Sequence, residues 1–305
     1  MDAAELRVIC GPTAAGKSTL ALALAERFGA TIISADSRQV YRGFDVGTAK
    51  PSMADRTRVP HRGIDVVEPE ERYSAARWSA AAGGWIAEVL AGGRVPLIVG
   101  GTGLYIRALA AGMFDEPPLD VDRRERLGGV IADLPTDALR RWCAMVDPAL
   151  AHLGRTQLLR AIEIATLTGQ RLSDLQRRTA RPALHPVRYL VVDPGPVLAA
   201  RIDARTDAML AGGWPDEVRR LSARVPAHAP AWKASGYAWV QALVNGTVDR
   251  ATARERIVIE TRQYAKRQRT WFRHQLPAGS TVRLSPEDPQ FNRIADGWWE
   301  GERVT

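Results

Sequence analysis

The sequence predicts an α/β fold, a doubly wound parallel sheet that is interrupted by an all-helical insertion. Three observations lead to this prediction. Short apolar runs alternate with helical segments in the first part of the chain, only helical periodicity is found from Asp122 to about Gln176, and a strand-like run returns at Tyr189–Asp193. Strands that alternate with crossover helices form parallel sheets, so a separate helical unit is expected inside one α/β core.

The first part of the chain supplies three strands of this sheet. Leu6–Cys10, Ala30–Ser34 and Pro96–Val99 are apolar runs of strand length. A helix rich in alanine and leucine, Thr19–Phe28, separates the first two, and the helical pattern Ala75–Ala91 precedes the third. Such alternation is typical of repeated strand–helix–strand units.

The character of the chain changes after the acidic, proline-rich segment Asp115–Leu119, which we interpret as a linker. Helical patterns follow at Ala138–Val146 and Gln157–Leu167, and the core resumes with the helices Val197–Ala211 and Arg250–Gln275. We therefore divide the chain into a first core segment (1–115), a helical insertion (116–185), a second core segment (186–285) and a tail (286–305). The tail contains Trp298 and Trp299 but no motif.

Composition narrows the class of protein. A chain of 305 residues that is 46% hydrophobic can build a full core, which excludes global disorder. The net charge of +8 favours a polyanionic partner such as nucleic acid, although only four basic residues are lysine and a GC-rich gene would also give many arginines. Cys10 and Cys143 are too few for a disulfide framework or a metal cage. With no signal peptide and no membrane-length apolar run, we expect a cytoplasmic protein and no membrane partner.

The segment Gly11–Ser18 carries the clearest motif. Its residues Gly11, Pro12, Thr13, Ala14, Ala15, Gly16, Lys17 and Ser18 have the spacing of a Walker A phosphate-binding loop, directly after a strand and at the start of a helix. In such a loop the backbone N–H groups and the lysine bind phosphate oxygens, and the serine hydroxyl binds Mg²⁺. The prediction is therefore a P-loop-containing core that binds a di- or triphosphate. No acid ends the strand Pro96–Val99, which disfavours a motor ATPase.

Asp36 follows the second strand and is the first candidate for chemistry. Ligands of open α/β sheets bind at the carboxyl ends of the strands, so Asp36 is expected on the same rim as the P-loop. A carboxylate facing a phosphate is repelled unless a cation lies between them or the carboxylate takes a proton. The alternative is that Asp36 only caps the next helix. Position alone leaves both interpretations open.

Taken together, the motifs resemble the tRNA dimethylallyltransferases, also called tRNA isopentenyltransferases, of the bacterial type. The resemblance covers about residues 5–275. It is carried by Gly11–Ser18, Asp36–Arg42, Asp45–Pro51, Pro60–Arg62, Val99–Tyr105, Arg160–Glu163, Thr261–Gln268 and Thr270–Arg273. No Cys/His pair follows residue 275, so the zinc finger of eukaryotic relatives is missing.

The resemblance implies a reaction and a set of roles. Dimethylallyl diphosphate would give its five-carbon group to the exocyclic N6 amine of the adenosine that is 3′-adjacent to the anticodon, with Mg²⁺ present and diphosphate released. Asp36 would be the general base, Thr102 a site residue near the base and the diphosphate, and Arg205 the residue that neutralises the diphosphate. From the residues alone, the favoured interpretation of Arg205 is an arginine on a solvated helix face.

The resemblance also implies contacts with the anticodon stem-loop of tRNA. The expected tRNA-binding residues are Asp36, Ser37, Arg38, Gln39, Thr102, Arg123, Arg124, Gln157, Leu158, Leu159, Arg160, Ala161, Lys266, Arg269 and Arg273. The basic side chains of Arg250–Gln275 favour a stripe for the tRNA backbone, while Ile257, Gln268 and Phe272 belong to the face expected to pack. The protein is expected to be a monomer.

The sequence departs from the family pattern in two further places, and three alternative functions stay open. Leu153-Gly154-Arg155 and Gln157 stand where the family carries an Asn-Asp pair and an arginine, and Gly236-Tyr237-Ala238-Trp239 replaces a Gly-Tyr-Lys-Glu string. The alternatives are a small-molecule kinase or ATPase, an enzyme that prenylates free adenine nucleotides, and an RNA-binding module without catalysis.

Overall fold

The computed structural model describes residues 5–112, 117, 119–178 and 185–301. The chain divides into two compact units, a core unit of Met1–Ala110 with Leu184–Thr305 and a helical unit of Ala111–Ala183. Most of the predicted linker Asp115–Leu119 lies outside the described residues. In the described ranges, no helix is both long and apolar enough to cross a bilayer.

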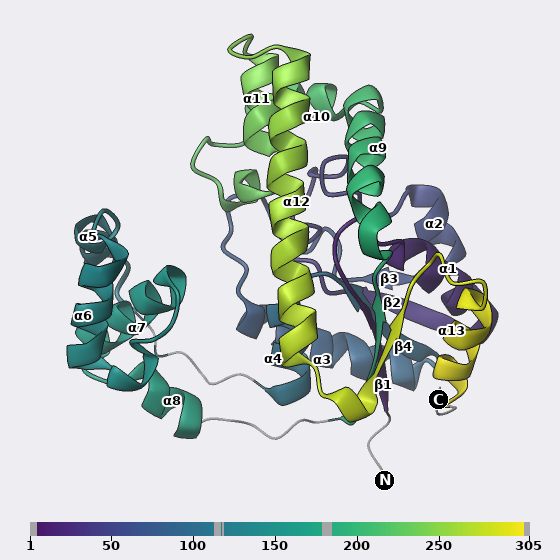
Figure 1. Cartoon of the computed structure of the whole chain (residues 1–305), viewed down its shortest axis with the longest axis horizontal. Coiled ribbons are helices and arrows are strands. Elements are labelled where there is room, and N and C mark those ends of the chain that lie inside the picture. Colours follow the sequence, from purple (N-terminus) through teal and green to yellow (C-terminus); the bar gives the residue numbers. More distant parts are fainter. Residues whose placement is uncertain (1–4, 113–116, 118, 179–184, 302–305) are drawn as a thin grey trace. The chain divides into compact units, whose positions relative to one another are not determined.

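The core unit is built on one six-stranded sheet in which every strand pairing is parallel, with the order β3-β2-β4-β1-β5-β6 (Figure 1). In this register Ile9 lies opposite both Val99 and Leu190. The strands are β1 (Leu6–Cys10), β2 (Ala30–Ser34), β3 (His61–Arg62), β4 (Val95–Gly100), β5 (Val187–Val192) and β6 (Thr281–Leu284). The predicted parallel α/β sheet is confirmed, and its central strands β1, β2 and β4 are apolar runs that are largely buried on both faces.

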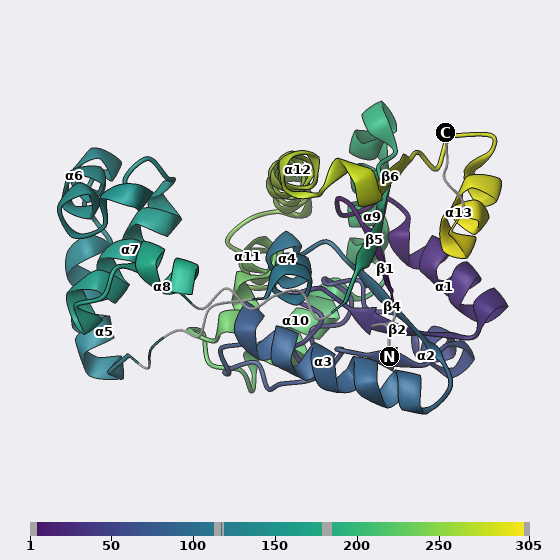
Figure 2. The ribbon, with the colours of Figure 1, turned by 90° about the horizontal axis from the view of Figure 1, so that it is seen from below.

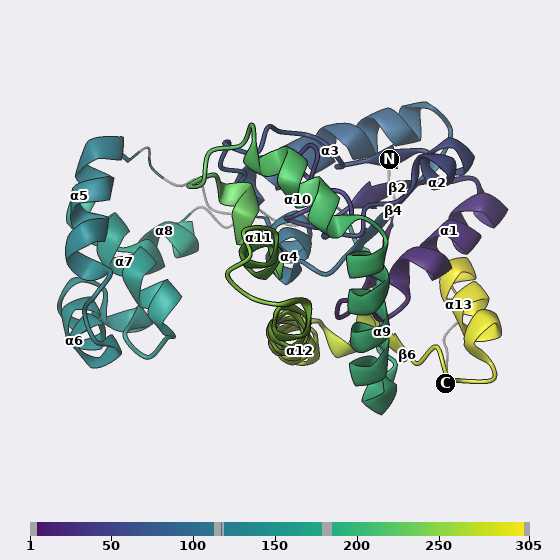
Figure 3. The same cartoon turned by 90° about the horizontal axis from the view of Figure 1, so that it is seen from above.

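Helices cover both faces of the sheet. Figure 2 shows α1 and α13 on one side and α3 and α4 on the other, as a doubly wound fold requires. The helices of this unit are α1 (Lys17–Phe28), α2 (Met53–Arg58), α3 (Ala75–Ala91), α4 (Gly103–Ala111), α9 (Leu198–Ala211), α10 (Trp214–Ser222), α11 (Tyr237–Val244), α12 (Arg250–Gln275) and α13 (Phe291–Glu300). The long α12 runs beside α9, as Figures 1 and 3 both show.

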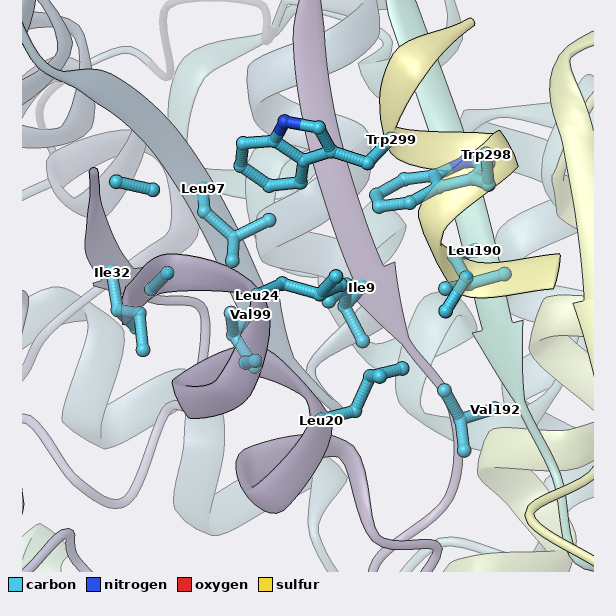
Figure 4. Packing of buried hydrophobic residues seen from close by; sticks show 14 of the residues in the cluster. Ile9, Leu20, Leu24, Ile32, Leu97, Val99, Leu190, Val192, Trp298 and Trp299 are labelled. Atoms are coloured by element: carbon cyan, nitrogen blue, oxygen red, sulfur yellow. The ribbon is translucent and has the colours of Figure 1, made fainter. Parts of the chain in front are cut away.

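The segment 286–305, for which the sequence indicated no structure, contains α13 and completes the core. Figure 4 shows Trp298 and Trp299 above the apolar side chains of the sheet, where they join the cluster that includes Ile9 and Leu190. The ring of Trp299 stacks on Phe28 with 4.9 Å between centroids. Helix α13 therefore covers the part of this sheet face that the P-loop helix α1 leaves open.

The helical unit consists of α5 (Val121–Ile131), α6 (Thr136–Val146), α7 (Arg155–Thr168) and α8 (Leu172–Arg178), which agrees with the predicted helical periodicity. It has an apolar core of its own, with Leu139, Leu158 and Ile162 fully buried. Asp147, also buried, accepts hydrogen bonds from the N–H and the hydroxyl of Ser173 at 2.9 and 2.7 Å and so satisfies the start of α8.

Candidate active site

A cavity of about 1110 Å³ opens in the core unit where β1, β2 and β4 end. The P-loop, the residues after β2 and the end of β4 form one side of its wall, and α9 and α12 contribute the other. Lys17, Ser18, Asp36, Arg205 and Gln268 all line it. Three predicted site residues from distant parts of the sequence, Lys17, Asp36 and Arg205, therefore face the same space.

The P-loop has the expected form, and its first glycine is dictated by the neighbouring strand. A Cβ on Gly11 would lie 2.1 Å from the carbonyl oxygen of Val192, and the φ of 143° suits glycine alone. Lys17 Nζ donates to the carbonyl of Pro12 at 2.6 Å. Burial and, to a smaller extent, the nearby Arg205 lower the pKa of Lys17 to about 8, against the opposing effect of Asp36. A bound anion would stabilise the charged form of Lys17 and so oppose this lowering of its pKa.

Arg205 is not on a solvated helix face, so that alternative is wrong. Its guanidinium lies at the cavity and donates to the hydroxyl of Thr13 in the P-loop at 3.4 Å. Burial lowers the pKa of Arg205, and Asp36 raises it. Two partly desolvated cations, Arg205 and Lys17, thus lie in the field of one carboxylate.

Asp36 does not cap a helix, so that alternative is also wrong. The residues after it form turns, and the next helix, α2, begins at Met53 with Ser52 as its N-cap. Asp36 Oδ1 accepts from the N–H of Arg38 at 2.8 Å, which fixes the carboxylate at the end of β2. The carboxylate lines the cavity with accepting positions still available for a ligand.

Thr102 joins the ends of β2 and β4 beside Asp36. Its hydroxyl accepts from the N–H of Ser37 at 3.0 Å and lies 3.3 Å from the Ser37 hydroxyl. The phenol of Tyr264, from α12, also hydrogen-bonds Thr102, and burial raises the pKa of Tyr264 to about 12. Tyr264 also lines the cavity.

Gln39, predicted to bind tRNA, is held by protein groups. Its Oε1 accepts from the Ser34 hydroxyl at 2.9 Å, and its Nε2 donates to the carbonyls of Thr48 and Ala49 at 3.3 and 3.2 Å. A base could use only the remaining acceptor position of Oε1. The side chain of Gln39 therefore also anchors the loop that follows.

This loop, residues 44–50, forms a rigid part of the cavity wall. The ammonium of Lys50, 1% exposed, binds the carboxylates of Asp45 and Asp65 at 2.7 and 2.6 Å. The buried carboxylate of Glu217 accepts from the N–H groups of Asp45 and Val46 and from the hydroxyl of Tyr237. No role was predicted for Glu217, and only its place beside apolar residues in α10 could have indicated that it is buried.

The basic face of α12 is partly used inside the protein. The predicted packing of Ile257, Gln268 and Phe272 is confirmed. The guanidinium of Arg269, predicted to bind tRNA, binds the carboxylate of Asp193, and it donates to the carbonyl of Gly195 at 2.5 Å. The Arg269 side chain is still 31% exposed, and its contact with tRNA stays a prediction. Two further arginines of the helix form ion pairs with α9, namely Arg254 with Asp207 and Arg262 with Asp203.

Lys266 and Arg273 remain candidates for tRNA contact. Both are exposed, and neither forms an ion pair with a residue that the structure describes.

In the helical unit the structure separates the predicted tRNA residues. Leu158 and Ala161 are 0% exposed, so their side chains have no surface with which to touch tRNA, which corrects that prediction. Arg124 and Arg160 both pair with Glu163. Three further predicted residues keep solvent contact: Arg123 and Gln157 are exposed and Leu159 is half-buried.

Comparisons with known proteins agree with this geometry. The IPP transferase family model matches residues 39–275 and the isopentenyl transferase model matches residues 4–60. The chain is 46% identical to a tRNA dimethylallyltransferase of Anaeromyxobacter sp. over 88% of this chain and 90% of that one. It is also 46% identical to a protein of the same name from Alkalilimnicola ehrlichii, over 92% and 90%.

Two solved structures extend the comparison. The tRNA isopentenylpyrophosphate transferase of Bacillus halodurans has a TM-score of 0.66 at 32% identity and covers 97% of both chains. A eukaryotic dimethylallyltransferase that acts on tRNA has a TM-score of 0.78 at 25% identity, over 99% of this chain and 81% of that chain. The phosphate-binding loop, the facing carboxylate and these matches place the chain in the IPP transferase family of tRNA dimethylallyltransferases.

Proposed function

We propose that this protein transfers the dimethylallyl group of dimethylallyl diphosphate to the exocyclic N6 amine of the adenosine that is 3′-adjacent to the anticodon in tRNA. The observation that carries the proposal is the single cavity in which Lys17 and Arg205 face Asp36. Alkyl transfer from a diphosphate needs cations for the leaving group and a base for the attacking amine. The described part of the site supplies both.

The chemistry follows from these positions. The N6 lone pair attacks C1 of the dimethylallyl group, the C1–O bond breaks, and its electron pair leaves with the diphosphate. Lys17, Arg205 and the P-loop N–H groups stabilise the charge that develops on the leaving group. Asp36 accepts the proton that N6 loses, and Thr102 orients the acceptor side of the site.

A magnesium ion fits the donor set beside the P-loop. The Ser18 hydroxyl is exposed toward the cavity that also holds Asp36, and oxygen ligands of this kind suit Mg²⁺ when phosphate oxygens complete its shell. In the described ranges, no group of three or more His, Cys, Asp or Glu side chains could hold a metal ion by itself. The ion would therefore take phosphate oxygens of the substrate among its ligands. Bound there, the ion would neutralise part of the diphosphate charge.

We further propose that residues 116–185 clamp the anticodon stem-loop. Arg123, Arg124, Gln157, Leu159 and Arg160 would supply contacts from the helical unit, and Lys266 and Arg273 from α12. The target adenosine must leave the loop stack to reach Asp36, as base-modifying enzymes require. Exposed arginines suit this role because they bind phosphates and stack on bases. We expect a cytoplasmic monomer.

The test is transfer of labelled dimethylallyl from its diphosphate to unmodified tRNA in the presence of Mg²⁺. We expect Asp36→Asn to lower kcat by about 10²–10⁴ because it removes the base, while binding of inorganic diphosphate is retained. Binding of diphosphate and of tRNA to each variant serves as the control.

Three outcomes would contradict the proposal. Full activity in Asp36→Asn would exclude its role as base. ATP turnover without tRNA would favour a kinase or ATPase, and transfer to free adenosine monophosphate alone would favour a nucleotide prenyltransferase.

A further inference from the structure

Gln268, on the buried face of α12, connects two parts of the cavity wall through its carboxamide. Its Oε1 accepts from the N–H of Thr13 at 2.8 Å, and its Nε2 donates to the carbonyl of Gly101 at 2.8 Å. The residue is 6% exposed. Thr13 belongs to the P-loop, whereas Gly101 directly precedes Thr102 at the end of β4.

The Gln268 carboxamide lies so close to the backbone of Gly101 that position 101 has no room for a side chain. A Cβ on Gly101 would lie 2.3 Å from Gln268 Nε2, although Gly101 does not have a positive φ. The backbone conformation at position 101 therefore does not require glycine. The close approach of the Gln268 carboxamide does require it.

The same region of α12 holds a third strand end. Arg269, the next residue, binds Asp193 and the carbonyl of Gly195 just after β5. Thr13 is in turn bound through its hydroxyl to Arg205. Since β4, β1 and β5 are neighbours in the sheet, two consecutive residues of α12 hold the ends of all three strands.

We propose that Gln268 is a positioning residue for prenyl transfer, which rests on the proposed function. It sets the separation between the P-loop, which receives the diphosphate, and the turn that carries Thr102 beside Asp36. The reacting carbon and nitrogen must come to about 3–3.5 Å before reaction, and a displacement of about 1 Å can cost a factor of about 100 in rate. A carboxamide suits this role because it accepts from one partner and donates to the other.

The first experiment compares Gln268→Ala and Gln268→Glu with Gln263→Ala, an exposed glutamine of the same helix. We expect the single-turnover transfer rate at saturating tRNA to fall about 100-fold in Gln268→Ala. Gln268→Glu keeps the acceptor for Thr13 but cannot donate to Gly101, so it should also be slow. The tRNA dissociation constant and the activity of Gln263→Ala should stay at the wild-type level.

The second experiment is a double-mutant cycle with Gly101→Ala, whose Cβ would displace the carboxamide. If the bridge carries the effect, adding Gln268→Ala to Gly101→Ala should cost no further rate. Additive losses would overturn the proposal. So would wild-type rates in both Gln268 variants, or a loss confined to the KM for tRNA.

Binding of inorganic diphosphate separates this proposal from the proposed function. We expect Gln268→Ala to weaken it about tenfold because the P-loop loses a support that holds it ready for the anion. If the wild type transferred no prenyl group, the proposed function would fail. Unchanged diphosphate binding in Gln268→Ala and Gln268→Glu, with wild-type thermal stability, would then also overturn the role of Gln268 in holding the P-loop.

Discussion

The charged side chains around the cavity of the core unit differ in their exposure from the arginines on the surface of the helical unit. In the core unit, Lys50 and Glu217 are buried, Lys17 and Arg205 are partly desolvated, and all four are held by specific neighbours. In the helical unit, an apolar interior carries arginines on its surface, and the side chain of Arg124 is 38% exposed. Desolvated and fixed charges suit transition-state stabilisation, whereas exposed arginines suit salt-dependent binding of a polyanion.

The largest expected effect comes from a substitution that destabilises the helical unit alone. Leu158→Ala removes a fully buried side chain from its core and should destabilise that unit by about 2–5 kcal/mol. We expect tRNA affinity to fall while the affinity for inorganic diphosphate is unchanged. Calorimetric unfolding and the two binding measurements check this.

The matched variant is Leu24→Ala, which removes a fully buried leucine from α1 in the core unit. It should weaken diphosphate binding, because α1 begins at the P-loop. If Leu158→Ala weakened diphosphate binding as much as Leu24→Ala does, diphosphate binding would not be a property of the core unit alone, as we describe it.

An intermediate effect concerns the pH dependence of the core unit. Because burial lowers the pKa of Lys17 to about 8, the ammonium of the free protein is charged below that pH and neutral above it. Affinity for diphosphate should therefore fall as pH rises above 8, by up to about tenfold per pH unit. Titration calorimetry across this range, with Lys17→Met as the reference, measures it.

The reference variant should bind diphosphate weakly and should lack this fall, because it has no titrating ammonium. The same pH profile in wild type and Lys17→Met would assign the effect to the diphosphate itself.

The smallest effect concerns single arginines of the helical unit. Arg123→Ala should weaken tRNA binding several-fold and reduce the slope of log K against log salt by about 1, because one phosphate contact is lost. The rate at saturating tRNA should not change. Arg140→Ala is the control, since Arg140 is exposed on the same unit and pairs only locally with Asp137. Equal salt slopes for the two variants would contradict a specific role for Arg123.

Much of the fold could be predicted because its signals are local. The strands are short apolar runs, and the boundaries predicted for α3 and α12 agree with the structure. The P-loop was recognisable for the same reason, since its eight residues are contiguous. The segment 286–305 was not interpretable, because Trp298 and Trp299 find their partners in α1 and in strands far away in the sequence.

The site was less predictable, because which partner a polar side chain finds is a tertiary property. Gln268 stood out only as a polar residue on a packing face, and nothing nearby in sequence identifies Thr13 and Gly101 as its partners. The ion pair of Arg269 was not predicted because Asp193 lies 76 positions before it. The burial of Leu158 and Ala161 follows from helical periodicity, but the family resemblance outweighed that signal.

The position of α13 has a consequence for how the chain folds during its synthesis. Arg7 in the first strand donates to the carbonyl of Trp299, 292 positions later, at 3.0 Å. At bacterial and eukaryotic translation rates, these two residues leave the ribosome roughly 15–60 s apart. Until then the P-loop helix exposes the apolar surface that the two tryptophans cover. The nascent protein is thus prone to aggregation while its phosphate-binding segment is already made, until α13 is synthesised and covers that surface.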